Sequence, residues 1–274
     1  PGGMALRHGD RAWTFAEWLA DCRQLAHDLP GSPTPFICSG DTLELARHAY
    51  ACGFQNWAFF PVHRGNALPA INRSLADVAL IIATSGSEGR PRQVMLSAAN
   101  LDAAAAAANH HLGLATGDLW LNCLPLYHIG GLSILWRCAR AGAGILLHDG
   151  FSCAAVADAL AGQPVTHLSL VPAMLAQMLA AGVRPPATLR HVMVGGAALA
   201  MSLYAQATAA GWPLNPSYGM SETAAQFATF DPADGAWHPG RVGRPMPGHD
   251  IRIGDDGRIR VRGPQIMRSY LDGS

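Results

Sequence analysis

The chain has 274 residues, of which 50% are hydrophobic and 14% are charged, with 19 basic and 19 acidic side chains. A chain of this length and composition can bury a substantial core, as one large domain or two small ones. Its formal net charge is zero and no block of Lys and Arg is present, which argues against nucleic acid or an anionic membrane as partner and favours a small molecule.

The N-terminal part of the chain predicts helices that alternate with strands. Thr14-x-x-Glu17 is a capping-box pattern, and apolar residues at helical spacing continue it into a helix over 13–29. Asp41-x-x-Glu44 marks a second helix start. Short strands are predicted around these helices, at residues 35–38 and 56–62.

A loop rich in glycine and hydroxyl side chains follows an apolar run that ends at residue 83. The run leads into Thr84-Ser85-Gly86-Ser87-Glu88-Gly89-Arg90-Pro91-Arg92-Gln93 and becomes apolar again at Val94. We expect a strand, a phosphate-binding loop and a second strand, because small side chains let backbone N–H groups crowd an anion while hydroxyls and arginines add donors. A hairpin with two surface arginines is the alternative. A Walker-type loop is disfavoured, since its Gly-Lys-Ser/Thr ending and its helix are missing.

The middle of the chain predicts further pairs of strands and helices. Ser97 or Asn100 can cap a helix through the alanine block 103–108, and His110 and His111 near its end are expected to favour the helix dipole rather than bind metal. Strands that alternate with helices along the chain predict an α/β fold of layered sheets flanked by helices. Strands are expected at 119–124, 144–148, 165–171 and 189–194, and helices at 132–141, 154–161, 173–181 and 199–210.

The C-terminal part has a different pattern. Residues 250–253 and 258–262 alternate with period two around Gly254-Asp255-Asp256-Gly257, which predicts a hairpin with one solvent-exposed face. The Pro, Gly and Asp content of 231–240 indicates a boundary. We therefore expect an α/β part that binds nucleotide and acyl group at residues 1–235, and a small β subdomain at 236–274.

The cysteines and the apolar runs bear on the cellular compartment. Six cysteines are scattered without a C-x-x-C pair, which favours buried free thiols over a disulfide framework and fits a reducing compartment. No apolar stretch approaches the length of a membrane span, and the N-terminus has no signal-peptide pattern. A cytoplasmic location is the expectation.

Three further segments carry candidate binding residues. They are Leu124-Pro125-Leu126-Tyr127-His128-Ile129-Gly130-Gly131, Val194-Gly195-Gly196-Ala197-Ala198-Leu199 and Asn215-Pro216-Ser217-Tyr218-Gly219-Met220-Ser221-Glu222-Thr223. The first follows a predicted strand, where open α/β sheets bind ligands. The glycines of the second follow another predicted strand and leave backbone without side-chain cover. Taken singly, the three could be a packed Tyr-His pair, a strand-to-helix turn and a loop before a capped helix.

Together, and in this order, the segments resemble the adenylate-forming superfamily of acyl-CoA synthetases, adenylation domains and luciferases. The resemblance extends over residues 11–272 and includes the 84–93 loop, Gly240 to Gly248 and Arg262 to Leu271. Within the superfamily, residues 124–148 and 166–172 are most similar to o-succinylbenzoate-CoA ligases. Glu88 stands where the family has Thr or Ser, and Arg92-Gln93 stands where it has Lys-Gly. Full activity is therefore not assured by this loop alone.

The resemblance implies a reaction and a set of site residues. A carboxylic acid and ATP would form acyl-AMP and pyrophosphate, and then acyl-CoA, with ATP, Mg²⁺ and CoA as cofactors. His128, Ser221 and Glu222 would be catalytic, with Glu222 holding Mg²⁺ and Ser221 donating to the α-phosphate, while Tyr218 stacks on adenine. The implied nucleotide contacts are Thr84, Ser85, Gly86, Ser87, Gly89, Arg92, Gly195, Gly196, Ala197, Ser217, Tyr218, Gly219, Met220 and Ser221.

Several alternatives stay open at this point. The acid could be o-succinylbenzoate or another aryl or medium-chain acid, and Arg137 could pair with a second substrate carboxylate or cover the surface. The family's C-terminal lid domain is absent from these residues, so we expect impaired turnover. An adenylation domain that loads a carrier protein and a catalytically silent nucleotide-binding module are the competing interpretations. A carrier protein or a second copy of the chain remains open as partner.

Overall fold

The computed structural model describes residues 3–31, 35–65, 71, 75–84 and 91–273. Its seven described helices of the α type are α1 Phe15–Asp28, α2 Thr42–Gln55, α3 Ala98–Leu112, α4 Ile129–Ala141, α5 Cys153–Gly162, α6 Pro172–Ala180 and α7 Met201–Ala209. Two short 3₁₀ helices are also described, η1 Ser221–Thr223 and η2 Pro232–Asp234.

The described strands form three sheets. The largest contains β1 Met4–His8, β2 Arg11–Thr14, β7 Leu119–Asn122, β8 Gly144–Leu147, β9 His167–Leu170, β10 His191–Val194, β11 Leu214–Met220, β12 Ala225–Thr229 and β13 Arg244–Pro245, in the order β13-β12-β11-β10-β9-β7-β8-β1-β2. The second contains β3 Phe36–Cys38, β4 Phe59–Pro61, β5 Leu80–Ala83, β6 Gln93–Leu96 and β16 Ser269–Tyr270, in the order β16-β6-β5-β4-β3. The third is the hairpin of β14 Asp250–Ile253 and β15 Ile259–Arg262.

Helix starts are set by the capping residues that the sequence predicts. Thr14, Asp41 and Ser97 are the N-caps of α1, α2 and α3, and each makes both hydrogen bonds of a capping box. The partner in the third box is Asn100, so both residues considered for that cap take part. Local side-chain chemistry therefore determines where these three helices begin.

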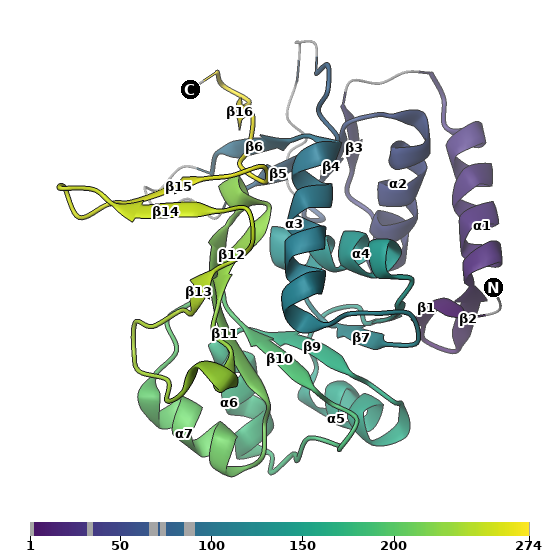
Figure 1. Ribbon diagram of the computed structural model, residues 1–274. Coiled ribbons are helices and arrows are strands. Elements are labelled where there is room, and N and C mark those ends of the chain that lie inside the picture. The colour runs from purple at the N-terminus through teal and green to yellow at the C-terminus, as the bar shows by residue number, and fades with distance from the viewer. Residues whose placement is uncertain (1–2, 32–34, 66–70, 72–74, 85–90, 274) are drawn as a thin grey trace.

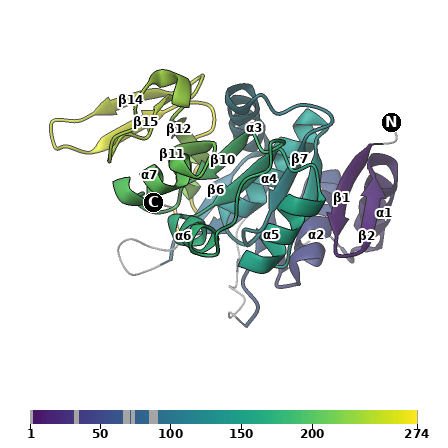
Figure 2. The same cartoon turned by 90° about the horizontal axis from the view of Figure 1, so that it is seen from below.

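Helices α3 and α4 lie between the two larger sheets (Figure 1). One buried cluster joins these layers, with Ile82 and Leu96 from the second sheet and Trp120 and Ile145 from the first. A separate cluster packs α5, α6 and α7 on the opposite face of the large sheet, because successive residues of a strand point to opposite faces. The predicted α/β class, with layered sheets flanked by helices, is confirmed (Figures 1 and 2).

Several strands were not predicted. β1 pairs antiparallel with β2 and parallel with β8, which adds an edge to the large sheet. Asn215 and its successors form strand β11, and β12 returns antiparallel beside it, where the alternative expectation was a loop before a capped helix. That alternative is wrong because backbone pairing overrides the breaker residues Pro216 and Gly219.

The C-terminal residues are divided among all three sheets. β13 pairs with β12, β16 pairs with β6, and only the β14–β15 hairpin forms a sheet of its own among the described residues. The hairpin is confirmed, but its apolar face is not covered, since Ile253 is 77% exposed and Ile259 48%. It projects from the body of the molecule (Figure 1). The division of the chain near residue 235 stays a prediction.

The six cysteines are free, as predicted, and Cys22, Cys52, Cys123 and Cys138 are buried. In the part of the chain that the structure describes, no helix combines the length and the apolar character needed to cross a bilayer.

Candidate functional site

The two arms of the predicted phosphate loop are paired strands. β5 runs antiparallel to β6, with Ile82 opposite Val94 and Ala83 opposite Gln93. At the base of the loop the N–H of Thr84 donates to the carbonyl of Arg92 at 2.8 Å, and the N–H of Arg92 donates to Thr84 Oγ1 at 3.0 Å. The strand, loop and strand arrangement is thus confirmed for its arms. Ser85, Gly86, Ser87 and Gly89 lie outside the described residues.

Glu222 meets the base of this loop through Tyr270. Glu222 lies in η1, directly after β11, and the hydroxyl of Tyr270 donates to its Oε1 at 2.8 Å. Tyr270 lies opposite Val94 in the β16–β6 pair, and the guanidinium carbon of Arg92 lies 3.2 Å from the centroid of its ring. An oxygen of Asp272 is 3.9 Å from Arg92 Nη2. The structure therefore brings together Arg92 and Glu222, which are far apart in the sequence.

The protonation state of Tyr270 suits a hydrogen-bond donor. Burial raises its pKa above the ordinary value of a tyrosine, and the hydrogen bond and negative charge of Glu222 raise it further. The hydroxyl therefore keeps its proton at neutral pH and can donate it to the carboxylate.

The ends of β10 and β11 form an open surface with little side-chain cover. The two strands are parallel, with Val194 opposite Pro216. Gly196 has φ +78° and is exposed, as is Ala197, and a Cβ on Gly195 would lie 2.8 Å from Ser217 Oγ. These positions leave backbone accessible where a planar ring could rest.

Two side chains stand beside that surface. Tyr218 is 39% exposed and packs edge-on against Phe227 at 5.3 Å between ring centroids, while Met220 is 37% exposed. Ser221 follows at the start of η1, partly exposed and adjacent to Glu222. Tyr218 can therefore offer a ring face to a ligand while its edge is held by the fold.

His128 lies at the end of the segment that follows β7. It is the N-cap residue of α4, and its ring centroid lies 4.7 Å from that of Tyr127. The ring centroid of His63 lies 5.0 Å from that of Tyr127. Burial lowers the pKa of His128, and the nearby His63 lowers it further, so the imidazole is neutral at neutral pH. A neutral imidazole can accept or donate a hydrogen bond.

The turn that carries His128 is fixed by a buried asparagine. Asn122 Nδ2 donates to the carbonyl of Gly131 at 3.0 Å, and its Oδ1 accepts from the N–H of Leu124 at 3.2 Å. Only glycine fits at 131, since a Cβ there would lie 2.5 Å from the Pro125 carbonyl oxygen. This turn, the glycines after β10 and the Ser217 to Glu222 segment all lie at the carboxyl ends of parallel strands, where open α/β sheets bind ligands.

Arg137 is buried in α4, with an exposed fraction of 3%. Its Nη2 donates to Gln226 Oε1 at 2.6 Å, its Nη1 contacts Met193 Sδ at 3.6 Å, and Trp120 lies beneath it with the ring centroid at 5.5 Å. Among the described residues its hydrogen-bond partners are Met193 and Gln226, neither of them acidic, and its Nε has none. Burial lowers its pKa to about 10, which leaves it charged at neutral pH. The expectation that Arg137 covers the surface is therefore wrong.

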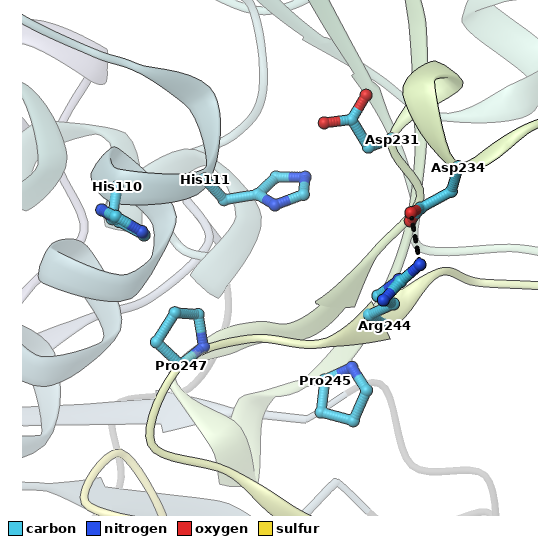
Figure 3. Close-up of a pocket in the computed structure, with 7 residues that line it drawn as sticks. All are labelled: His110, His111, Asp231, Asp234, Arg244, Pro245 and Pro247. Carbon is cyan, nitrogen blue, oxygen red and sulfur yellow. Dashed lines mark ion pairs between the residues drawn. The ribbon is translucent and has the colours of Figure 1, made fainter.

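A cavity of about 490 Å³ is lined by residues at the end of α3, in and just before η2, and in and after β13 (Figure 3). Arg244 and Asp234 form an ion pair at 2.9 Å beside it, and none of the sequence-predicted site residues is among the described side chains that line it. Burial lowers the pKa of His111, so this side chain is neutral at neutral pH and gives little charge to the helix dipole. The lining is His110, His111, Asp231, Asp234, Arg244, Pro245 and Pro247.

The donor set at Glu222 fits one kind of metal site. Within the described residues, no group of three or more His, Cys, Asp or Glu side chains could hold an ion as a cage. Mg²⁺ bound to nucleotides is held by one or two carboxylates, phosphate oxygens and water rather than by such a cage. Glu222, with Oε2 outside any hydrogen bond to a described residue, is suited to that mode.

Sequence reasoning missed two residues of this region. Tyr270 and Gln265 lie in the segment from Arg262 to Leu271, in which the sequence indicates no site residue. Gln265 is fully buried, and its Nε2 donates to the carbonyls of Thr223 and Gln226 at 2.8 and 3.0 Å. A polar residue and an aromatic residue in a short C-terminal segment give no local signal of such contacts.

The fold and these strand ends define an α/β protein with a candidate ligand site at the carboxyl ends of parallel strands. Residues 37–271 match the family of AMP-binding enzymes, and the chain belongs to that family of adenylate-forming proteins. It is 37% identical over 206 residues to a 2-succinylbenzoate–CoA ligase of Bacillus licheniformis, covering 72% of this chain and 43% of the relative. A ligase of the same name from Staphylococcus aureus is 32% identical over 203 residues, covering 72% and 41%.

Solved structures agree with this assignment. The o-succinylbenzoate coenzyme A synthetase of Bacillus subtilis in complex with AMP matches with a TM-score of 0.87 and 25% identity, over 98% of this chain and 86% of that one. The same enzyme in complex with ATP and a magnesium ion matches with a TM-score of 0.83 and 27% identity, over 98% and 70%. The chain spans about two-fifths of the length of the curated relatives, 43% in the first case.

Proposed function

We propose that these residues are the nucleotide- and acyl-binding part of an ATP-dependent carboxylate–CoA ligase. The reaction would join a carboxylic acid to AMP with release of pyrophosphate, and then transfer the acyl group to CoA. The observation that carries the proposal is the contact that links Glu222, through Tyr270, to Arg92 at the loop base. The named relatives support the same reaction class.

Each part of the site has a proposed role. Thr84 and Arg92 would orient the phosphates together with Ser85, Gly86, Ser87 and Gly89, and Ser221 would donate to the α-phosphate. Tyr218 would stack on adenine above the backbone of Gly195, Gly196 and Ala197, with Ser217, Gly219 and Met220 beside it. Glu222 would hold Mg²⁺, which when bound supplies charge neutralisation at the phosphates. His128 would border the acyl group.

The substrate would be o-succinylbenzoate or another aryl acid with a second carboxylate. Arg137 supports this, because a buried guanidinium without a described acidic partner is costly unless an anion binds to it. His128 and Arg137 lie on the same helix nine residues apart, which is about 13 Å along its axis. A dicarboxylate would place one carboxylate at the reaction centre and the other at Arg137. We propose a cytoplasmic location, where the thiols stay reduced.

Calorimetry with an acyl-sulfamoyl adenosine analogue and with ATP and Mg²⁺ tests nucleotide binding. We expect the 274-residue chain to bind both. Tyr218→Ala should lower the affinity for the analogue about 10-fold, because ring stacking is lost. Phe54→Ala is the matched control, since Phe54 and Tyr218 are both 39% exposed. Heat with neither ligand would contradict the proposal that this part of the chain binds nucleotide.

Turnover is tested separately by exchange of labelled pyrophosphate. We expect exchange by this chain to be slow, because the relatives contain further residues that these 274 do not align with. Exchange at the rate of an intact ligase would contradict that. Transfer to CoA or to a carrier protein's phosphopantetheine by the whole protein distinguishes the two acceptors.

A further inference from the structure

We propose that Tyr270 is a positioning residue, which holds the Glu222 carboxylate and the Arg92 guanidinium in one fixed arrangement for a metal–nucleotide complex. This inference rests on the proposed function. It assigns two separate jobs to one side chain: the hydroxyl orients Glu222, and the ring supports Arg92.

The hydroxyl acts at the end of a long, flexible side chain. Glu222 lies in the three-residue turn η1, and its backbone carbonyl accepts from the N–H of Met267 at 2.8 Å. With Tyr270 bound to Oε1 at 2.8 Å, both the backbone and the head of Glu222 are fixed. Oε2 is then presented in one orientation, and the cost of ordering the carboxylate is met before a cation arrives.

The ring acts on the loop base. The backbone of β16 pairs with β6, with Tyr270 opposite Val94 and the N–H of Leu271 bonded to the carbonyl of Gln93 at 2.8 Å. The ring therefore has a fixed place beside the start of β6, which follows Arg92 in the chain. The guanidinium 3.2 Å from the ring centroid is held over the aromatic face, where its donors stay in a defined plane.

The two jobs predict different losses. Tyr270→Phe keeps the ring and removes the hydroxyl, so Glu222 can rotate while Arg92 stays supported. We expect the affinity of the protein–ATP complex for Mg²⁺ to fall about 10-fold, which is the scale for loss of a residue that orients a metal ligand. Binding of AMP without metal should change less than about twofold. Tyr270→Leu removes the ring as well, so it should also lower the affinity for AMP.

The test is calorimetry on the 274-residue chain, with AMP in the presence of a chelator and with ATP over a series of Mg²⁺ concentrations. Mn²⁺ bound to the protein–ATP complex, followed by electron paramagnetic resonance, gives a second readout that does not depend on turnover. Tyr204→Phe is the matched control, because the Tyr204 ring packs on Trp237 at 4.6 Å and its hydroxyl bonds to no described residue. Thermal unfolding checks that each variant is folded.

A double-variant cycle separates positioning from a general loss of structure. In the Glu222→Gln background, Tyr270→Phe should alter Mg²⁺ affinity less than about twofold, since the hydroxyl no longer orients a ligand carboxylate. Incorporation of p-aminophenylalanine at position 270 keeps a ring and an N–H donor, and should restore most of the lost affinity even if the phenylalanine variant folds poorly.

The outcomes distinguish the inference from the proposed function. If the unaltered chain binds ATP with Mg²⁺ and Tyr270→Phe binds the metal equally well, the positioning role is overturned and the proposed function stands. The positioning role is also overturned if Tyr270→Phe lowers the affinity for AMP, measured without metal, as much as it lowers the affinity for Mg²⁺. If the unaltered chain binds no nucleotide, the proposed function fails and the role of Tyr270 fails with it.

Discussion

His167 is a titratable side chain that the fold keeps uncharged. It is fully buried between Trp120 and His191, with ring centroids 5.2 Å away on each side. Its Nδ1 lies 2.8 Å from Thr166 Oγ1 and its Nε2 lies 3.3 Å from the Leu112 carbonyl. Burial lowers its pKa to about 4, since the hydrogen bond to the Leu112 carbonyl and the charge of Asp118 raise the pKa by less than the loss of water lowers it. The neutral ring is thus part of the sheet's packing.

The lowered pKa predicts a loss of stability in acid. Between pH 6.5 and about 4 the unfolded chain binds a proton at His167 that the folded chain does not, so the free energy of unfolding falls as pH falls, by about 3 kcal/mol in all. Urea unfolding across this range should show the slope, and His167→Gln should flatten it. The exposed His27→Gln is the control, and an equal slope in both variants would contradict the assignment.

The turn from β11 through η1 to β12 carries Tyr218 and Glu222, and its backbone leaves no room for a larger residue at one position and is strained at two others. A Cβ on Gly219 would lie 2.1 Å from the Ala225 carbonyl oxygen. Ala224 and Ala225 have φ of 50° and 101°, where residues with a Cβ are strained. Such strain is retained where surrounding structure holds it, here beside the proposed nucleotide.

Gly219→Ala is expected to force β11 and β12 apart. We expect a loss of about 1–3 kcal/mol in the free energy of unfolding, and loss of nucleotide binding. Gly53→Ala is the contrasting change, since a Cβ in that part of α2 meets nothing within 4 Å, and it should stabilise the chain by about 0.5–1 kcal/mol. Urea midpoints compare the two. Equal midpoints would show that the turn can relax around a methyl group.

At the scale of the whole molecule, residues 264–272 tie the two large sheets together across the site. Gln265 bonds to the carbonyls of Thr223 and Gln226, and the Pro264 carbonyl accepts from Asn100 Nδ2 at 2.7 Å. Further on, β16 extends the second sheet. The segment therefore fixes η1, β12 and the loop base relative to one another.

Gln265→Leu should remove one of these ties without changing side-chain volume greatly. The buried carbonyls of Thr223 and Gln226 would lose their donor, which should lower the free energy of unfolding by about 1–3 kcal/mol. The affinity for nucleotide should fall as well. Gln206→Leu on the exposed face of α7 is the matched control and should lie within about 0.5 kcal/mol of the unaltered chain. A Gln265→Leu variant as stable as this control would show that water replaces the amide.

Much of the fold follows from local chemistry, and much of the site does not. Caps at Thr14, Asp41 and Ser97 and apolar runs are local signals, so those helices and strands could be predicted. β11 could not, because Pro216 and Gly219 are breakers when read singly and become strand only through pairing with β10 and β12. Arg137 in a helix suggests a surface position, and only the tertiary packing buries it.

The contact of Tyr270 with Glu222 spans 48 residues, and no periodicity reports a pairing of that kind. The family resemblance supplied the order of motifs but not the side chain that joins them. Residues at the carboxyl ends of parallel strands could be anticipated as neighbours from the β-α order alone. Their exact partners depend on the short pairing of β16 with β6.

The projecting hairpin β14–β15 bears on how the protein behaves in concentrated solution. Its two strands pair only with each other among the described residues, so each offers an open ladder of peptide groups next to the exposed Ile253 and Ile259. Arg252 and Arg260 stand opposite each other on these strands. Although each lies near an acidic side chain of the same hairpin, Asp250 and Asp256, we expect the two arginines to repel the same edge of another copy and so to oppose self-association. Concentrated salt shortens the reach of that repulsion to about 3 Å at 1 M and leaves the edge unguarded.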